Sequence, residues 1–227
     1  MKQIIIVFGI SLFMISIRLH SQNTYLQIGF GMHEDVHFGS NYVIDSIFIG
    51  PYSIKDDYRP IGMISYQKKV KDKIEIEVGF SYSKTYYSYI VGSYNPSFNS
   101  FTRKVGVRAA HTLTFPININ IAITKKLYVK AGLSATIGIL GSSNPIYFND
   151  TPEINDIYNS MQNIFTPNSV NYGFGGGYKI YRFDIVYCRK VSIGKVTKAI
   201  IVNNKEYEIF GKFYSNTISL LYSFKLK

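Results

Sequence analysis

The feature that most constrains this chain is an unbroken alternation of apolar with small or polar side chains over residues 127–139. Successive side chains of a β-strand point to opposite sides, so one face of such a strand is wholly apolar. The preceding run, 113–121, alternates in the same way, and the short segment 123–126 separates the two. The pattern predicts a long β-hairpin with one apolar face. The apolar positions of the second run are Leu127, Val129, Ala131, Leu133, Ala135, Ile137 and Ile139.

Alternation alone leaves open which face points inward, and the composition of the polar face favours one answer. A soluble barrel needs a charged, hydrated exterior, whereas a membrane barrel turns apolar side chains to lipid and polar ones to its lumen. Besides Tyr128 and Lys130, the second face of residues 128–138 holds only glycine, serine and threonine. That composition suits a cramped interior better than a hydrated surface, where Lys and Glu are common. We therefore expect the apolar face to contact lipid.

Eight segments show strand patterns, and the connections between them alternate between long and short. Bacterial outer-membrane barrels combine an even strand number with short periplasmic turns and longer extracellular loops. The sequence therefore predicts an all-β fold, an eight-stranded antiparallel up-and-down transmembrane β-barrel whose interior is filled by side chains. The expected strands are 25–31, 60–67, 74–83, 113–121, 127–140, 170–178, 183–188 and 217–226, and the expected long polar loops are 33–58, 84–104, 141–169 and 190–211.

Residues 1–21 have the composition of a secretory signal peptide. Lys2 provides the positive start, residues 4–17 the apolar core, and Ser21 a small residue at the exit. Arg18 and the shortness of the apolar run argue against a membrane-spanning helix, which needs about 20 apolar residues. We expect the outer-membrane barrel domain to comprise residues 22–227.

The chain is basic, with a formal net charge of +11. Its basic residues gather in the expected turns, such as Lys125 and Lys126, and not on one element as a phosphate-tracking patch requires, so no nucleic-acid partner is expected. Trp is absent, but there are 20 Tyr and 16 Phe, which suit strands and membrane interfaces. The single cysteine, Cys188, excludes an intramolecular disulfide.

Six charged residues fall in phase with the predicted inward face. Burying a lone charge in a small barrel is strongly unfavourable, so we expect these side chains to pair in an internal salt-bridge network, with a proton or ion path as the alternative. The two carboxylates of strand 74–83 lie two residues apart and are not placed across a sugar, as glycosidase chemistry requires. The predicted lumen-facing charges are Glu75, Glu77, Arg108, Lys130, Arg182 and Asp184.

Two motifs match functional signatures but lack the context that those signatures need. Residues 33–37, HEDVH, fit the zinc-protease pattern H-E-x-x-H, which requires a helix; here a strand leads into an expected loop. As a strand continuation, His33, Asp35 and His37 would share one face and could hold a metal incidentally. Residues 173–177, GFGGG, lack the Lys-Ser/Thr ending and the helix of a phosphate loop, and inward strand glycines explain them better. We expect no catalytic residues, metal or cofactor.

Three stretches resemble the PorT-like small outer-membrane β-barrels of Bacteroidota. Residues 77–83, EVGFSYS, are similar to that family's Glu-Leu-x-Tyr-Ser strand, with one extra strand repeat. Pro116 followed by Gly132 resembles its hairpin with proline in strand four and glycine in strand five. Residues 222–227, YSFKLK, resemble its closing tail, although the usual terminal Phe is missing. The resemblance implies an outer-membrane protein without catalytic residues, in a family with some members that serve protein secretion.

Together these observations predict a non-enzymatic outer-membrane barrel, monomeric, whose surface loops serve binding, adhesion or a secretion or assembly role. The expected partners are outer-membrane lipid and lipopolysaccharide, the barrel-assembly machinery, and a surface or secretion partner that the sequence does not identify. Two alternatives stay open: a narrow solute pore, and a membrane-embedded enzyme with its site in the extracellular loops.

Overall fold

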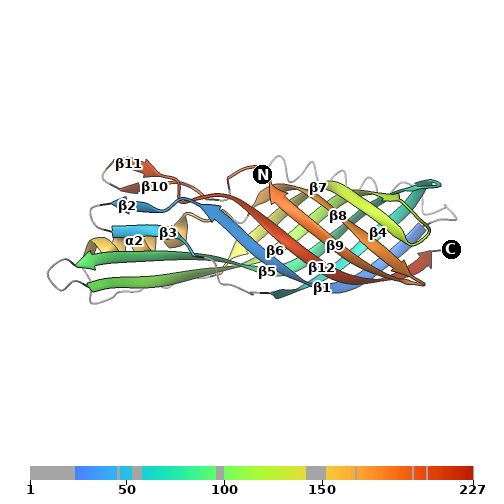
Figure 1. Ribbon diagram of the computed structural model, residues 1–227, viewed down its shortest axis with the longest axis horizontal. Coiled ribbons are helices and arrows are strands. Elements are labelled where there is room, and N and C mark those ends of the chain that lie inside the picture. The colour runs from blue at the N-terminus through green and yellow to red at the C-terminus, as the bar shows by residue number, and fades with distance from the viewer. Residues whose placement is uncertain are drawn as a thin grey trace.

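The structure is a computed structural model that describes residues 24–44, 47–52, 58–95, 100–141, 152–166, 168–195, 197–202 and 204–226. Eight long strands form a closed antiparallel barrel, which confirms the predicted fold (Figure 1). Each strand pairs with the next one round the ring, and the last pairs with the first. Closure leaves no unpaired edge, as a lipid environment demands. The predicted signal peptide, 1–21, lies outside the described residues. The barrel strands are β1 (Thr24–Gly39), β4 (Arg59–Lys71), β5 (Ile74–Asn95), β6 (Ser100–Ala122), β7 (Leu127–Leu140), β8 (Ser169–Ile180), β9 (Phe183–Ser192) and β12 (Phe210–Leu226).

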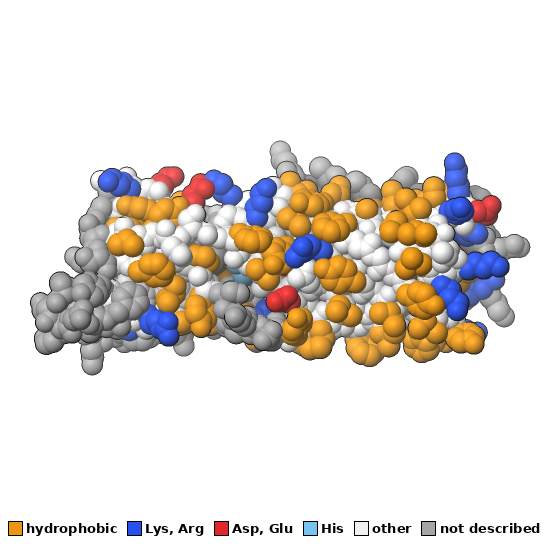
Figure 2. Space-filling view, viewed as in Figure 1, with side chains coloured by type: hydrophobic (Ala, Val, Ile, Leu, Met, Phe, Trp, Pro, Cys, Tyr) orange, Lys and Arg blue, Asp and Glu red, His pale blue; other side chains and the backbone are white. Residues whose placement is uncertain are grey.

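The apolar face of the barrel points outward, as the alternation predicts. In β7, Leu133 and Ile139 are 57% and 75% exposed, whereas Lys130 is only 6% exposed. Figure 2 shows apolar side chains spread over the barrel wall in a broad band. Such a contiguous exposed band is a membrane-contact surface, so the chain has the architecture of an outer-membrane β-barrel. Other outward apolar residues are Ile28, Phe30, Ile64, Phe80, Leu113, Ile119, Tyr172, Phe174, Ile185 and Ile218.

Short turns join the strands at one end of the barrel. Thr124 organises one of them, because its hydroxyl accepts hydrogen bonds from the backbone N–H groups of Lys126 and Leu127 at 3.2 and 2.9 Å. The β8–β9 turn contains Tyr181, whose φ of 55° places it in the left-handed region. The first and last barrel residues also meet here, since Thr24 pairs with Leu226. Short turns mark the periplasmic end of this class of barrel.

The opposite end carries a folded cap. The four segments predicted as long loops connect the barrel strands at this end, but they contain strands and a helix, so the prediction that they are polar loops is wrong. Strands β5 and β6 continue far beyond their neighbours as one projecting hairpin (Figure 1). Two short strands extend the sheet from the projecting part of β5, and a separate two-stranded hairpin and a helix complete the cap. Within the described part of the chain, no helix has the length and apolarity needed to span a bilayer. The cap elements are β2 (Tyr42–Ile44), β3 (Ile47–Pro51), α2 (Pro152–Asn163), β10 (Ile200–Val202) and β11 (Lys205–Tyr207).

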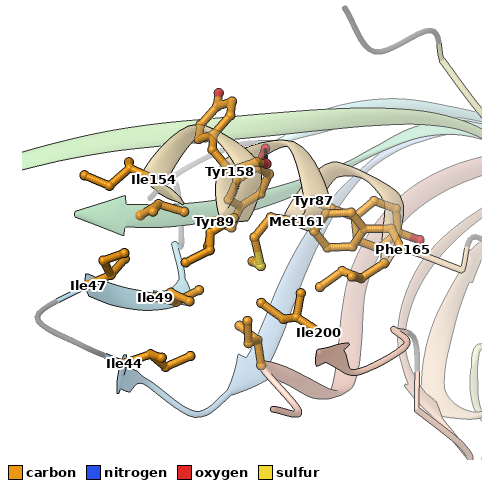
Figure 3. Close-up of a cluster of buried hydrophobic side chains, with 14 of the residues drawn as sticks. Ile44, Ile47, Ile49, Tyr87, Tyr89, Ile154, Tyr158, Met161, Phe165 and Ile200 are labelled. Carbon is orange, nitrogen blue, oxygen red and sulfur yellow. Dashed lines mark hydrogen bonds between the residues drawn. The ribbon is translucent and has the colours of Figure 1, made fainter. Parts of the chain in front are cut away.

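The cap has its own hydrophobic core at one end of the barrel (Figure 3). Tyr89 of β5 and Met161 of α2 have no exposed surface, and each large apolar side chain buried in this way contributes about 1.5–3 kcal/mol. The projecting hairpin needs a glycine at Gly106, because a Cβ there would overlap the ring of Tyr89. The cap is therefore a packed unit. Its buried core consists of Ile44, Ile47, Ile49, Tyr87, Tyr89, Val91, Ala110, Ile154, Ile157, Tyr158, Met161, Ile164, Phe165, Ile200 and Ile209.

Candidate functional site

A buried ion pair lies in the lower lumen, the half of the barrel interior nearer the short turns. Lys130 of β7 lies 2.7 Å from the Glu77 carboxylate of β5, and both side chains are 6% exposed. Asn118 and Asn120 of β6 donate to the two oxygens of Glu77 at 3.1 and 3.2 Å. The strand register brings these four residues together, because Glu77 faces Asn118 and Asn120 faces Lys130 across neighbouring strands. Glu77 is thereby a satisfied carboxylate, held by one cation and two amides.

A second polar layer closes the lumen nearer the short turns. Lys179 binds the Glu75 carboxylate at 2.9 Å and lies 5.3 Å from the ring centre of Tyr128. Asp184 accepts a hydrogen bond from the Gln27 side chain at 3.1 Å. Tyr128 needs Gly177 beside it, since a Cβ at that position would overlap the Tyr128 ring. This layer combines an ion pair, an amide–carboxylate hydrogen bond and an aromatic ring.

The structure brings four of the six predicted lumen charges into these two layers and leaves two outside. Arg182 is an exposed turn residue that donates to the Tyr222 hydroxyl at 3.2 Å, because β9 begins one residue later and the inward alternation does not extend to it. Arg108 lies farther up, in the cap part of β6 opposite Tyr87, and its Nε and one terminal nitrogen are buried. The four residues in the layers are Glu75, Glu77, Lys130 and Asp184.

The upper lumen holds a second charged cluster, which the sequence reasoning assigned to a loop. His33 Nδ1 lies 3.3 Å from Asp35 of the same strand, and the Arg59 guanidinium lies 3.7 Å from the other Asp35 oxygen. Arg59 also stacks at 4.3 Å from the ring centre of Tyr86. His37 Nε2 lies 3.2 Å from the Tyr86 carbonyl oxygen. These side chains share the inward face because β1 continues to Gly39 and does not end at Gly31.

The HEDVH segment is extended strand, so its residues do not have the zinc-protease arrangement. His33 and His37 lie four residues apart along a strand and are bound to different partners, while Glu34 points to the outer surface. Among the described residues, no group of three His, Cys, Asp or Glu side chains could hold a metal ion. The loop placement expected for this segment is wrong, and the alternative that its inward residues share one strand face is confirmed.

Two small cavities remain between the charged layers. Their volumes are about 60 and 30 Å³, and Lys190, Ile61 and Thr217 line both. Liquid water occupies about 30 Å³ per molecule, so these spaces suit one or two waters and no larger solute. Lys190 is a lumen cation that sequence reasoning missed, since it was placed at the start of a loop. The signal was available: Cys188 is in phase with the inward face of β9, and Lys190 follows it by two.

Aromatic rings cover the upper end of the lumen beneath the cap. The rings of His37 and Tyr87 lie 5.0 Å apart, and Tyr87 stacks on Phe165 at 4.7 Å. Above them, the Tyr89 hydroxyl donates to the backbone oxygen of Tyr158 in α2 at 3.2 Å. Burial in the cap raises the pKa of Tyr89 and of Tyr158 above its usual range, so both hydroxyls stay protonated and available as donors. The aromatic rings over the lumen and the core of the cap therefore form one packed assembly.

Comparison with known proteins gives fold likeness only. No protein-family model matches the chain, including any for the family that the sequence resembles, and no curated protein matches it. Among solved structures, AlkL in lipid bilayers is similar with a TM-score of 0.48 and 8% identity, over 91% of this chain and 92% of that one.

Two further outer-membrane proteins are similar at the same level. OprG from Pseudomonas aeruginosa has a TM-score of 0.45 at 12% identity, covering 90% of this chain and 97% of that one. Ail, the attachment invasion locus protein of Yersinia pestis, has a TM-score of 0.44 at 10% identity, covering 89% and 99%; its crystal contains the heparin analogue sucrose octasulfate. Likenesses this distant assign no task to this chain, whose barrel architecture is established by its own strand pairing.

Proposed function

We propose that this chain is a closed, non-enzymatic outer-membrane barrel that presents its folded extracellular cap as a binding surface. The observation that carries the proposal is the cap core, in which residues of six elements, β2, β3, β5, β6, α2 and β10, have lost nearly all solvent exposure. A surface that is already ordered does not have to be immobilised when its partner binds, which favours affinity. Between the charged layers, the described lumen residues enclose cavities of about 60 and 30 Å³, too small for a solute path, which argues against the solute-pore alternative.

The exposed charges on the described residues of the cap favour an acidic partner. Among the described residues of the cap and its rim, exposed basic side chains outnumber exposed acidic ones, and one pair, Lys195 with Glu208, neutralises itself. A surface of one predominant charge attracts ligands of the opposite sign and increases their rate of association. A sulfated or phosphorylated polymer on another surface has the matching chemistry. The exposed charges are Lys84, Arg103, Lys195, Lys198, Lys205 and Lys212 against Asp156, Glu206 and Glu208.

Binding to an immobilised sulfated polysaccharide tests this proposal directly. The refolded protein in detergent should bind the sulfated polymer and not neutral dextran, and binding should weaken as salt rises. The variant Lys198→Glu/Lys205→Glu should bind at least tenfold more weakly. A matched control is Lys125→Glu/Lys126→Glu, which reverses two exposed charges in a periplasmic turn and should bind as wild type. Equal losses in both variants, or none in either, would refute recognition by the cap.

The two open alternatives have their own measurements. Purified protein in planar bilayers should give no conductance steps, and steady steps would favour the pore. Hydrolysis of peptide or lipid substrates that is lost on His33→Asn would favour the enzyme. The secretion role implied by the PorT-like resemblance stays a prediction, and recovery of a secretion component with the intact barrel from outer membranes would support it.

A further inference from the structure

Three polar residues interrupt the apolar outer wall side by side on three adjacent strands. Asn216 of β12 is the cross-strand partner of both Glu34 on β1 and Arg189 on β9. Its amide donates to the Glu34 carboxylate at 3.3 Å, and its carbonyl oxygen accepts from Arg189 Nε at 3.0 Å. We call these three residues the polar stripe. The outward residues two positions before and after each of them are apolar or aromatic: Met32 and Val36, Tyr214 and Ile218, Tyr187 and Val191.

The polar stripe is organised by aromatic neighbours. The Tyr187 hydroxyl donates to Asn216 at 3.1 Å, and the Arg189 guanidinium lies 4.2 Å from the ring centre of Tyr214. These contacts fix the Arg189 side chain and direct its Nε to Asn216, while the guanidinium carries two further nitrogens. Charged residues on the lipid face of a barrel are unfavourable with increasing depth. A hydrogen-bonded row of two charged residues and an amide inside the apolar band therefore indicates that a polar group meets the wall there.

An apolar groove adjoins the polar stripe on the same face. Its volume is about 740 Å³, and its lining combines barrel side chains such as Phe30, Ile185 and Leu220 with Tyr58, while Glu34 and Asn216 form its polar end. Figure 2 shows basic and acidic side chains set within the apolar band on this side of the molecule, which Figure 1 identifies as the side of β1, β12 and β9. This face of the barrel therefore has an apolar groove with a polar end.

We propose that the groove and the polar stripe bind one phosphorylated glycolipid of the outer leaflet. An acyl chain lies along the groove, the phosphate contacts the guanidinium of Arg189, and sugar hydroxyls donate to the Glu34 carboxylate. Arginine is suited to phosphate because its planar nitrogens form paired hydrogen bonds. The leaflet follows from position, since Glu34 lies nearer to Gly39 at the cap end of β1 than to Thr24 at the periplasmic end. The inference depends on the membrane placement in the proposed function but not on recognition by the cap.

Native mass spectrometry of the refolded protein, titrated with purified diphosphoryl lipid A in detergent, tests the site. Wild type should retain one lipid A, and Arg189→Gln should lower its affinity at least tenfold. The matched control is Arg182→Gln, which removes an arginine on the same face that bonds an outward tyrosine at the opposite end of the barrel. Dephosphorylated lipid A should bind wild type at least tenfold more weakly, and this arm requires no variant.

Several outcomes would overturn the site. They are equal retention of lipid A by wild type and Arg189→Gln, indifference to the phosphates, and retention of phosphatidylglycerol as strong as that of lipid A, which would mean that any anionic lipid suffices. A wild-type dimer that Arg189→Gln converts to monomer would identify a second copy of the chain as the occupant instead. Folding of each variant is verified by its heat-dependent shift in electrophoretic mobility. Loss of polysaccharide binding in the cap experiment would leave this result intact, so the two proposals fail separately.

Discussion

Removal of the buried cation Lys130 is the most direct test of how the barrel tolerates charge in its lumen. In Lys130→Met, the methionine fills similar space, but the Glu77 carboxylate, 6% exposed, loses the ammonium that lies 2.7 Å from it. Removing one partner of a buried ion pair destabilises the folded protein by about 3–5 kcal/mol. Two amide donors, Asn118 and Asn120, still contact Glu77, so we expect a loss near the lower end, about 3 kcal/mol. Urea unfolding in phospholipid vesicles, followed by far-ultraviolet circular dichroism, measures the loss.

The double variant makes the reasoning quantitative. Glu77→Gln alone leaves the ammonium of Lys130 without its carboxylate and should destabilise the barrel about as much as Lys130→Met. The double variant leaves no buried charge at these two positions. It should be at least about 2 kcal/mol more stable than the sum of the two single losses predicts. As a control, Lys195→Met removes one partner of the exposed cap pair with Glu208, where we expect less than about 1 kcal/mol. Single losses that add to within about 0.5 kcal/mol would refute the idea of a mutually dependent pair.

Three further predictions concern the wall, the cap and the lumen. Replacing Leu133 by Arg puts a charge on the lipid face and should destabilise the barrel in vesicles by up to about 2–4 kcal/mol. The same replacement at Ile123, an exposed residue of a periplasmic turn, should be nearly neutral in the same urea titration. Met161→Ala should remove about 2–5 kcal/mol from the cap, so that proteases cleave the cap while the barrel band stays intact; a uniformly resistant cap would contradict its separate core. Cys188 lines the 60 Å³ cavity, so a bulky maleimide should label it only after unfolding, and rapid labelling of the folded protein would mean that the lumen is open.

The barrel could be predicted because its determinant is local and periodic. Whether a side chain of β7 faces lipid or lumen follows from its parity, and Leu133 and Lys130 lie where the alternation places them. The order of long and short connections then fixes the number of strands and the antiparallel ring. Even the partners of Glu77 follow from parity and register, since its amide and ammonium donors are inward residues of the next two strands.

The cap could not be predicted in this way because its core is assembled from distant segments. Met161, Ile49 and Tyr89 come from a helix and two strands that are far apart in the chain, and no short periodic pattern shows that they meet. One signal is present at residues 86–91, where three tyrosines, an isoleucine and a valine do not suit a polar loop. The upper lumen is not predicted for a related reason: the strand pattern breaks at Gly31, so the sequence places His33 and Asp35 in a loop, whereas they continue the inward face of β1.

Different interactions close the two ends of the lumen, an ion pair at one end and stacked aromatic rings at the other. This difference limits where a binding site can lie. At the periplasmic end, Glu75 and Lys179 form an ion pair that is partly exposed, so hydration helps to stabilise it. At the cap end, Tyr87 and Phe165 close the lumen with stacked rings that join a hydrophobic core, where water is excluded. Opening a path would therefore require both an ionic layer and a packed core to separate together. A closed interior of this kind supports our proposals that recognition takes place on the outer surfaces, at the cap in water and at the polar stripe in the membrane.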